Sequence, residues 1–175
     1  MEYLQMIMDT NIQRKHGFKS MEDILAFEQK YGIDLSQVYK QFLLHYGSGY
    51  IKDDYCYKAK EKSPLTPEDD YDITDYFYGS DIVDNIETYK EEFERKLLPI
   101  ADAGGGDFIC LGVRDNYKDK IYYWTHDGRG KYEKNLYLIA DTFEDFISSF
   151  EKHKHEQKID LEDIELFLDD DLLND

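Results

Sequence analysis

The stretch that most constrains the fold is LLPIADAGGGDFICLGV, residues 97–113, in which three consecutive glycines stand between Asp102 and Asp107. An apolar run typical of a buried strand follows them. A glycine run can cradle phosphate, act as a hinge, or let the backbone turn where no side chain is permitted. The first explanation would make the protein a nucleotide binder. The last would make the triplet a mark of the fold, with the function elsewhere.

The triplet has no other feature of a phosphate site. It lacks the lysine of GxxxxGK[ST] and the GxGxxG spacing before a helix. A strand follows it, so no helix N-terminus faces the loop. Asp102 and Asp107 would repel phosphate. We therefore predict no nucleotide cofactor, and a tight glycine turn that leads into a central strand.

Apolar periodicity gives helices first, then strands, then a closing helix. Ser20 and Ser36 are suited to cap two helices, and residues 82–93 have the spacing of a third. FICLGV and IYYWTH are expected to form a hairpin, and NLYLIA a further strand. In the closing helix, Asp141 and Glu144 suggest a capping box. This order predicts an α+β fold with a mainly antiparallel sheet.

Charge is concentrated in two segments of the chain. The formal net charge is −18, from 39 acidic and 21 basic residues. Residues 53–92 hold thirteen acids and four bases, and residues 156–175 hold nine acids and one base. Nucleic acid and anionic membranes are disfavoured partners, since both are negative, and a basic partner is favoured. The alternative is an acidic surface that only confers solubility.

Length and composition indicate a soluble cytoplasmic protein. No apolar stretch approaches the ~20 residues that span a bilayer, and the N-terminus does not resemble a signal peptide. Cys56 and Cys110 make no disulfide framework, and Cys110, inside FICLGV, is expected to be a buried free thiol. We predict one domain over residues 1–152 and an acidic amphipathic tail over residues 153–175.

The sequence offers no case for an enzyme. Covalent catalysis needs a nucleophile, a base and an orienting group together, and no such set stands out. The zinc spacing HExxH is absent, and His126–Asp127 is a single candidate ligand pair with nothing nearby to complete it. We therefore expect no catalytic residue, no metal and no cofactor.

Binding has more support, because the acidic segment also carries tyrosines. Tyrosine offers a rigid contact area with a polar tip and is enriched at binding hot spots. Neighbouring carboxylates would steer a cationic partner. The alternative is that several of these tyrosines belong to the core. The predicted partner-binding residues are Asp53, Asp54, Tyr55, Asp69, Asp70, Tyr71, Asp72, Asp75, Tyr76 and Tyr78.

The tail combines acids with apolar residues. Leu161, Ile164, Leu168 and Leu172 recur at spacings of three, four and four. This pattern is typical of an amphipathic helix that docks on its own domain or on a partner. A disordered terminus is the alternative.

Several stretches together resemble the SUKH superfamily, which includes the yeast cell-wall assembly regulators. FEQKYGIDLSQVYKQFLLHYGSG is similar to its opening, LLPIADAGGGDFICLGV to its central hallmark, and IYYWTHDG and LIADTFEDFI to its later strand and closing helix. The resemblance covers residues 20–152. It implies helices packed on one face of a curved, mainly antiparallel sheet. It gives no catalytic residues to carry over.

The resemblance also implies a function. Most bacterial members are immunity proteins of polymorphic toxin systems, which neutralise a toxin that is often a nuclease. Our leading hypothesis is a cytoplasmic immunity protein that binds a basic, secreted toxin. The alternative is a non-catalytic regulatory or adaptor scaffold.

Overall fold

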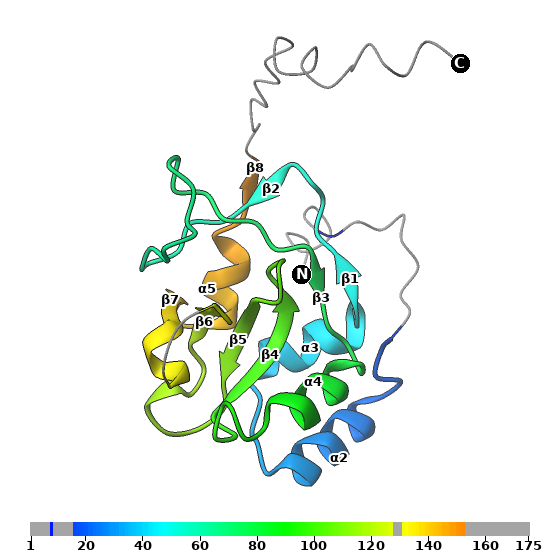
Figure 1. The fold of residues 1–175 in the computed structure, drawn as a ribbon. Helices are drawn as coiled ribbons and strands as arrows, with labels where there is room; N and C mark the ends of the chain where they lie inside the picture. Colours follow the sequence, from blue (N-terminus) through cyan, green and yellow to red (C-terminus); the bar gives the residue numbers. More distant parts are fainter. Residues whose placement is uncertain (1–7, 9–15, 128–130, 153–175) are drawn as a thin grey trace, which may run out of the picture.

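The computed structural model describes residue 8, residues 16–127 and residues 131–152 (Figure 1). They form a six-stranded sheet in the order β1-β3-β4-β5-β6-β7, with every neighbouring pair antiparallel, and a small β2-β8 sheet. This confirms the α+β class and the closing helix. The helices are α2 (Met21–Tyr31), α3 (Gln37–His45), α4 (Ile82–Tyr89) and α5 (Phe143–Ser148), with short 3-10 turns η1 (Asp115–Tyr117) and η2 (Tyr132–Asn135). The strands are β1 (Gly49–Tyr50), β2 (Tyr55–Cys56), β3 (Tyr76–Phe77), β4 (Leu97–Asp102), β5 (Phe108–Gly112), β6 (Ile121–Trp124), β7 (Leu136–Ala140) and β8 (Glu151–Lys152).

The predicted caps of the first two helices are confirmed. The Ser20 hydroxyl accepts from the Asp23 backbone N–H at 3.2 Å, and the Asp23 carboxylate accepts from the Ser20 N–H at 3.1 Å. This capping box satisfies two N–H groups at the start of α2. Gly32 ends the helix with a φ of 61°, which glycine adopts without strain. Ser36 caps α3 through the Tyr39 N–H.

The closing helix starts one residue later than predicted. Thr142, not Asp141, is its N-cap, and its hydroxyl accepts from the Asp145 N–H at 3.0 Å. Asp141 instead forms an ion pair with Lys60, which draws its carboxylate away from the helix. The predicted Asp141–Glu144 capping box is therefore wrong, although the helix itself is confirmed.

The third helix is shorter than residues 82–93. It ends at Tyr89, and the backbone then turns through Glu94 and Arg95, whose φ angles are 48° and 57°. The turn brings Phe93 onto the sheet, with its ring centroid 5.0 Å from that of Trp124. The chain thus forms this aromatic contact instead of continuing the helix.

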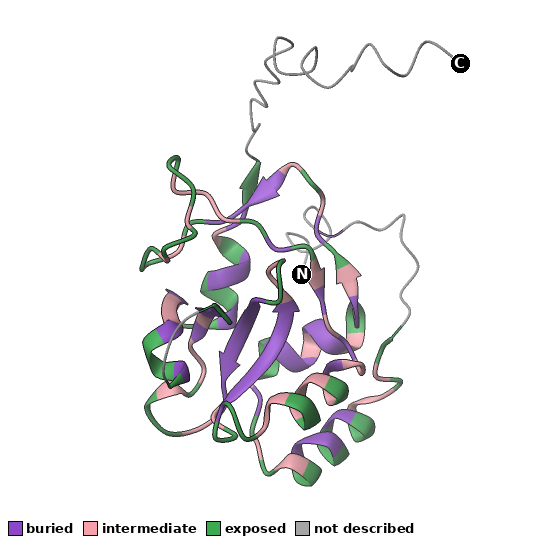
Figure 2. Cartoon of the chain, in the orientation of Figure 1, coloured by how far each residue is buried: buried purple, intermediate pink, exposed green. Residues whose placement is uncertain are grey.

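The central strands β4 and β5 are buried on both faces (Figure 2). Ile109 and Leu111 of β5 point into the larger cluster, to which α2, α3 and α5 contribute. Phe108 and Cys110, one residue out of phase, point into a second cluster with Phe93. This alternation follows from the period of two in a strand. The prediction of helices on one face of the sheet is confirmed, because α2, α3 and α5 contribute to the larger cluster. Cys110 is a buried free thiol, as predicted.

The glycine triplet forms the turn between β4 and β5. Gly104, Gly105 and Gly106 have φ angles of 83°, 61° and 96°, a region that side chains rarely adopt. The Asp107 N–H donates to the Gly104 carbonyl at 2.9 Å and closes the turn. The prediction of a glycine turn before a central strand is confirmed.

The predicted tail, residues 153–175, lies outside the described residues. Among the described helices, none is long and apolar enough to cross a membrane.

Candidate partner-binding site

A groove of about 670 Å³ lies beside the glycine turn. Its walls come from the loop over residues 65–73, from the glycine turn, and from Tyr123 of β6 with His126 and Asp127, which follow that strand. Leu65 and Ile73 stand at the groove with 58% and 51% of their surface exposed. An open concave surface that combines exposed apolar side chains with carboxylates is suited to another macromolecule.

Backbone and side-chain hydrogen bonds fix the 65–73 loop. Tyr57 and Asp72 exchange two backbone hydrogen bonds, each of 2.9 Å. The Thr66 hydroxyl donates to the Asp72 carboxylate at 3.2 Å. The Tyr71 hydroxyl donates to Glu151 at 2.6 Å, which ties the loop to β8. The loop therefore presents its carboxylates from a defined backbone.

Asp107 is the buried acid of the groove. Its carboxylate accepts from the Tyr123 hydroxyl and from the His126 backbone N–H at 2.9 Å, and lies 2.8 Å from His126 Nδ1. Burial by itself would raise the pKa of Asp107. Hydrogen bonds from Tyr123, His126 and Thr125 outweigh that effect and leave this pKa lowered. Asp107 is thus an ionised, fully hydrogen-bonded anchor.

His126 lies between two carboxylates. Its Nε2 is 3.1 Å from Asp127 Oδ1, while its Nδ1 faces Asp107. The hydrogen bond to Asp107 is the main cause of the raised pKa of His126, and the charge of Asp127 adds to it. This arrangement favours imidazolium and leaves neither ring nitrogen free to take a proton from a nucleophile. In the part of the chain that the structure describes, no three His, Cys, Asp or Glu side chains are grouped to hold a metal ion.

The His126 environment predicts a pH-dependent stability. Because the pKa of His126 is higher in the folded than in the unfolded state, the imidazolium stabilises the fold. This stabilisation is complete at a pH below the unfolded-state pKa of about 6.5, and it is lost as the pH rises through the folded-state pKa. We expect His126→Gln to lower the Tm more at about pH 6 than at about pH 8.5. Thermal unfolding measures this, with exposed His45→Gln as control. Equal losses at both pH values would contradict a charged pair.

Half-exposed tyrosines form a row on the sheet face next to the groove. The ring centroids of Tyr50 and Tyr76 are 4.9 Å apart, and those of Tyr76 and Tyr78 are 5.6 Å apart. The Tyr76 hydroxyl donates to Asp81 at 2.9 Å. Burial raises the pKa of both Tyr76 and Tyr78 to about 12, so both phenols stay neutral at physiological pH.

Sequence reasoning missed Tyr50, which is 42% exposed. It precedes the acidic segment, so local composition gave no reason to include it. The register between β1 and β3 places Tyr50 directly opposite Tyr76. Only the pairing of these two short strands identifies it.

The ten predicted partner-binding residues fall into three groups. Asp53, Asp54 and Tyr55 lie at β2, Asp69 to Asp72 belong to the groove loop, and Asp75, Tyr76 and Tyr78 lie on or beside β3. Tyr55 is only 6% exposed and belongs to the core, as the alternative interpretation allowed. Asp54 pairs with Lys152 at 2.8 Å, and Asp70 pairs with Lys62. The residues closest to the groove itself are Tyr71 and Asp72, which line it.

The groove and the tyrosine row meet at the end of β4. Asp102 is paired with Tyr76 across the sheet, and its carboxylate accepts from the Gly104 N–H at 2.7 Å. Ala103 and Gly104, the next two residues, line the groove. Two of the three predicted groups therefore adjoin one continuous edge of the molecule.

The sequence of this chain is similar to a known protein family and to a bacterial protein. Residues 20–149 match the model of the SMI1 / KNR4 family (SUKH-1). The chain is also 34% identical over 179 residues, 92% of its own length and 90% of the other protein's, to the SPbeta prophage-derived uncharacterized protein YokK of Bacillus subtilis (strain 168). The family match takes in the three capped helices α2, α3 and α5 and the whole six-stranded sheet. The chain therefore belongs to the SMI1 / KNR4 (SUKH-1) family.

Proposed function

We propose that this protein is a cytoplasmic, non-catalytic immunity protein that binds and neutralises a toxin with a basic surface. The observation that carries the proposal is the edge where the acidic groove meets the tyrosine row. Family membership and a prophage-derived relative support it. The toxin would be held at the groove, and its active site would be blocked by the bound protein.

The chemistry of this edge suits lysine and arginine. Asp69, Asp75 and Asp127 are exposed carboxylates, which attract cations over distances of about 10 Å at moderate salt. Tyr50 and Tyr76 offer ring faces on which a guanidinium can stack. Leu65 and Ile73 add apolar area. Charge would accelerate the encounter, and the aromatic and apolar contacts would slow dissociation.

Neutralising three exposed groove-side acids should slow association with the toxin. We expect Asp69→Asn, Asp75→Asn and Asp127→Asn together to reduce the association rate constant about tenfold or more at low salt, and much less at high salt, because rim charges act mainly on encounter. Surface plasmon resonance against the toxin encoded in a neighbouring reading frame measures the rate. Growth on co-expression with that toxin measures protection.

The matched control is Glu91→Gln, Glu92→Gln and Glu133→Gln, which removes the same charge from exposed positions away from the groove. We expect it to change the rate by less than about twofold. Equal effects of the two triple variants would contradict the assigned surface. Failure of the wild type to bind or protect would contradict the immunity function. Binding to several proteins with little salt dependence would favour the scaffold alternative.

A further inference from the structure

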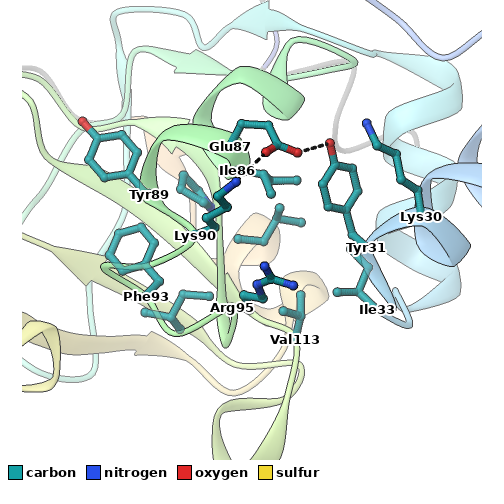
Figure 3. A pocket seen from close by; sticks show the side chains of 13 residues that line it. Lys30, Tyr31, Ile33, Ile86, Glu87, Tyr89, Lys90, Phe93, Arg95 and Val113 are labelled. Carbon is teal, nitrogen blue, oxygen red and sulfur yellow. Dashed lines mark hydrogen bonds and ion pairs between the residues drawn. The ribbon is translucent and has the colours of Figure 1, made fainter.

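A second cavity, distant from the groove, lies between α2, α4 and the start of β4 (Figure 3). Its volume is about 200 Å³. Ile33, Ile86 and Val113 are among its apolar walls, and buried Leu98 and Phe93 also line it. The volume is below the ~300 Å³ of a typical small-molecule site. It suits one or two inserted apolar side chains.

The rim of this pocket is basic, although the protein is acidic. Lys30, Lys90 and Arg95 line it together with one acid, Glu87, which gives a local net charge of 3 − 1 = +2. Glu87 is already engaged, since it lies 3.1 Å from Lys90 Nζ and accepts from the Tyr31 hydroxyl at 3.1 Å. The Arg95 guanidinium points into the opening in Figure 3. Within the described ranges, Arg95 has no carboxylate within ion-pair distance.

We propose that this pocket binds the acidic C-terminal tail of the same chain, through residues 166–173, LFLDDDLL. The pocket and this tail segment are complementary in both their apolar and their charged residues. The apolar lining suits one or two of the leucine and phenylalanine side chains, and the basic rim suits the three consecutive aspartates. The basic toxin proposed above would be repelled by the same rim. A toxin on the groove and the tail on the pocket therefore occupy separate surfaces.

As an extended chain, rather than the helix that its leucine spacing suggests, the tail is long enough to reach the pocket. Lys152 of β8 lies at one end of the body, and α2 and α4 lie at the other (Figure 1). A body of this size is about 40 Å across, so a path over its surface is about 60 Å. At about 3.4 Å per extended residue, positions 14 to 21 residues beyond Lys152 reach about 50–70 Å. Residues 166–173 are the apolar part of the tail at this distance.

Paramagnetic NMR on the full chain tests the proposal. A nitroxide on Asn174→Cys, with isoleucine methyl groups labelled, reports where the tail lies. Cys56 and Cys110 are buried, and burial raises the pKa of both thiols, which disfavours their labelling. We expect loss of the Ile33 and Ile86 methyl signals and retention of the Ile73 signal in the groove. The lost signals should return at high salt, because the aspartate contacts are screened.

Charge-reversal variants distinguish binding of the tail at the pocket from a general effect of protein charge. Lys90→Glu with Arg95→Glu should restore the Ile33 and Ile86 signals. Lys19→Glu with Lys134→Glu, which makes the same charge change at exposed sites, should not. Phe167→Ser with Leu168→Ser should also restore them. Restoration by both charge variants alike would overturn the proposal.

Other occupants give different results. In a mixture of spin-labelled chains and chains without a spin label, the Ile33 and Ile86 methyl signals of both kinds can be compared. If these signals broaden as strongly in the chains without a label as in the labelled chains, the tail of another copy occupies the pocket and the proposal fails. If octanoate shifts these signals while the nitroxide never broadens them, the pocket takes a small amphipathic anion and the proposal also fails. None of these outcomes depends on the toxin, so they are independent of the proposed function.

Discussion

Gly112→Ala should lower the free energy of unfolding by about 3 kcal/mol or more. A Cβ at this position would lie 1.8 Å from the Tyr117 carbonyl oxygen and 2.4 Å from its carbon. The obstacle is backbone, which cannot rotate away as a side chain can. The connection after β5 is also held in place, since the Gly112 N–H donates to the Lys120 carbonyl at 2.8 Å and its carbonyl accepts from the Asp119 N–H at 2.9 Å. Urea unfolding measures the loss.

Gly105→Ala is the matched control. Its Cβ would meet nothing within 4 Å, so only its φ of 61° opposes the substitution. We expect a cost of about 1–2 kcal/mol, and less for Gly105→Asn, because asparagine adopts the left-handed region more readily. If Gly105→Ala were as damaging as Gly112→Ala, backbone conformation and not steric contact would dominate at both positions.

Lys40→Met should cost about 3–5 kcal/mol, the range for removing one partner of a buried ion pair. Lys40 and Glu28 are only 5% and 8% exposed, and Lys40 Nζ lies 2.8 Å from Glu28 Oε1. The same oxygen accepts from the Leu35 N–H at 2.6 Å. Without the ammonium group, the carboxylate would remain buried and uncompensated between α2 and α3.

A double-mutant cycle identifies the cause. Glu28→Gln keeps an acceptor for the Leu35 N–H and removes the charge, so Glu28→Gln with Lys40→Met should be more stable than Lys40→Met alone. Lys19→Met, at an exposed position, should change stability by less than about 0.5 kcal/mol. Strictly additive losses in the cycle would mean that the two side chains act independently. Thermal and urea unfolding provide the values.

Local signals predicted the framework well. Ser20 and Ser36 are each followed by an apolar helical stripe, and a cap hydrogen bond needs only a few adjacent residues. Three consecutive glycines ahead of an apolar strand favour a local turn once phosphate is excluded, and such a turn depends only on adjacent residues. Features that depend on distant segments were not predictable. Asp141 is a good capping residue, but Lys60 binds it from another part of the chain.

The candidate site was predictable only in part, for the same reason. The acidic segment pointed to Tyr71 and Asp72, which line the groove. His126 was considered only as a metal ligand, and its partner Asp107 only as a neighbour of glycines, because their contact spans two strands. The glycine turn was expected to lie away from the function. In our proposal Gly104 and Gly105 form part of the groove wall.

The pairing of β2 with β8 has a consequence for the time at which the groove loop is fixed in place during synthesis. Cys56 and Glu151, which face each other in this pair, are 95 residues apart in the sequence. Tyr71 of the groove loop is likewise held by Glu151. These contacts cannot form until residue 151 has left the ribosome, whereas α2 and α3 can pack much earlier. At about 5–20 residues per second, the groove loop is secured several seconds after its own synthesis. A nascent chain would thus hold its groove loop in place only after the residues of β8 have been made.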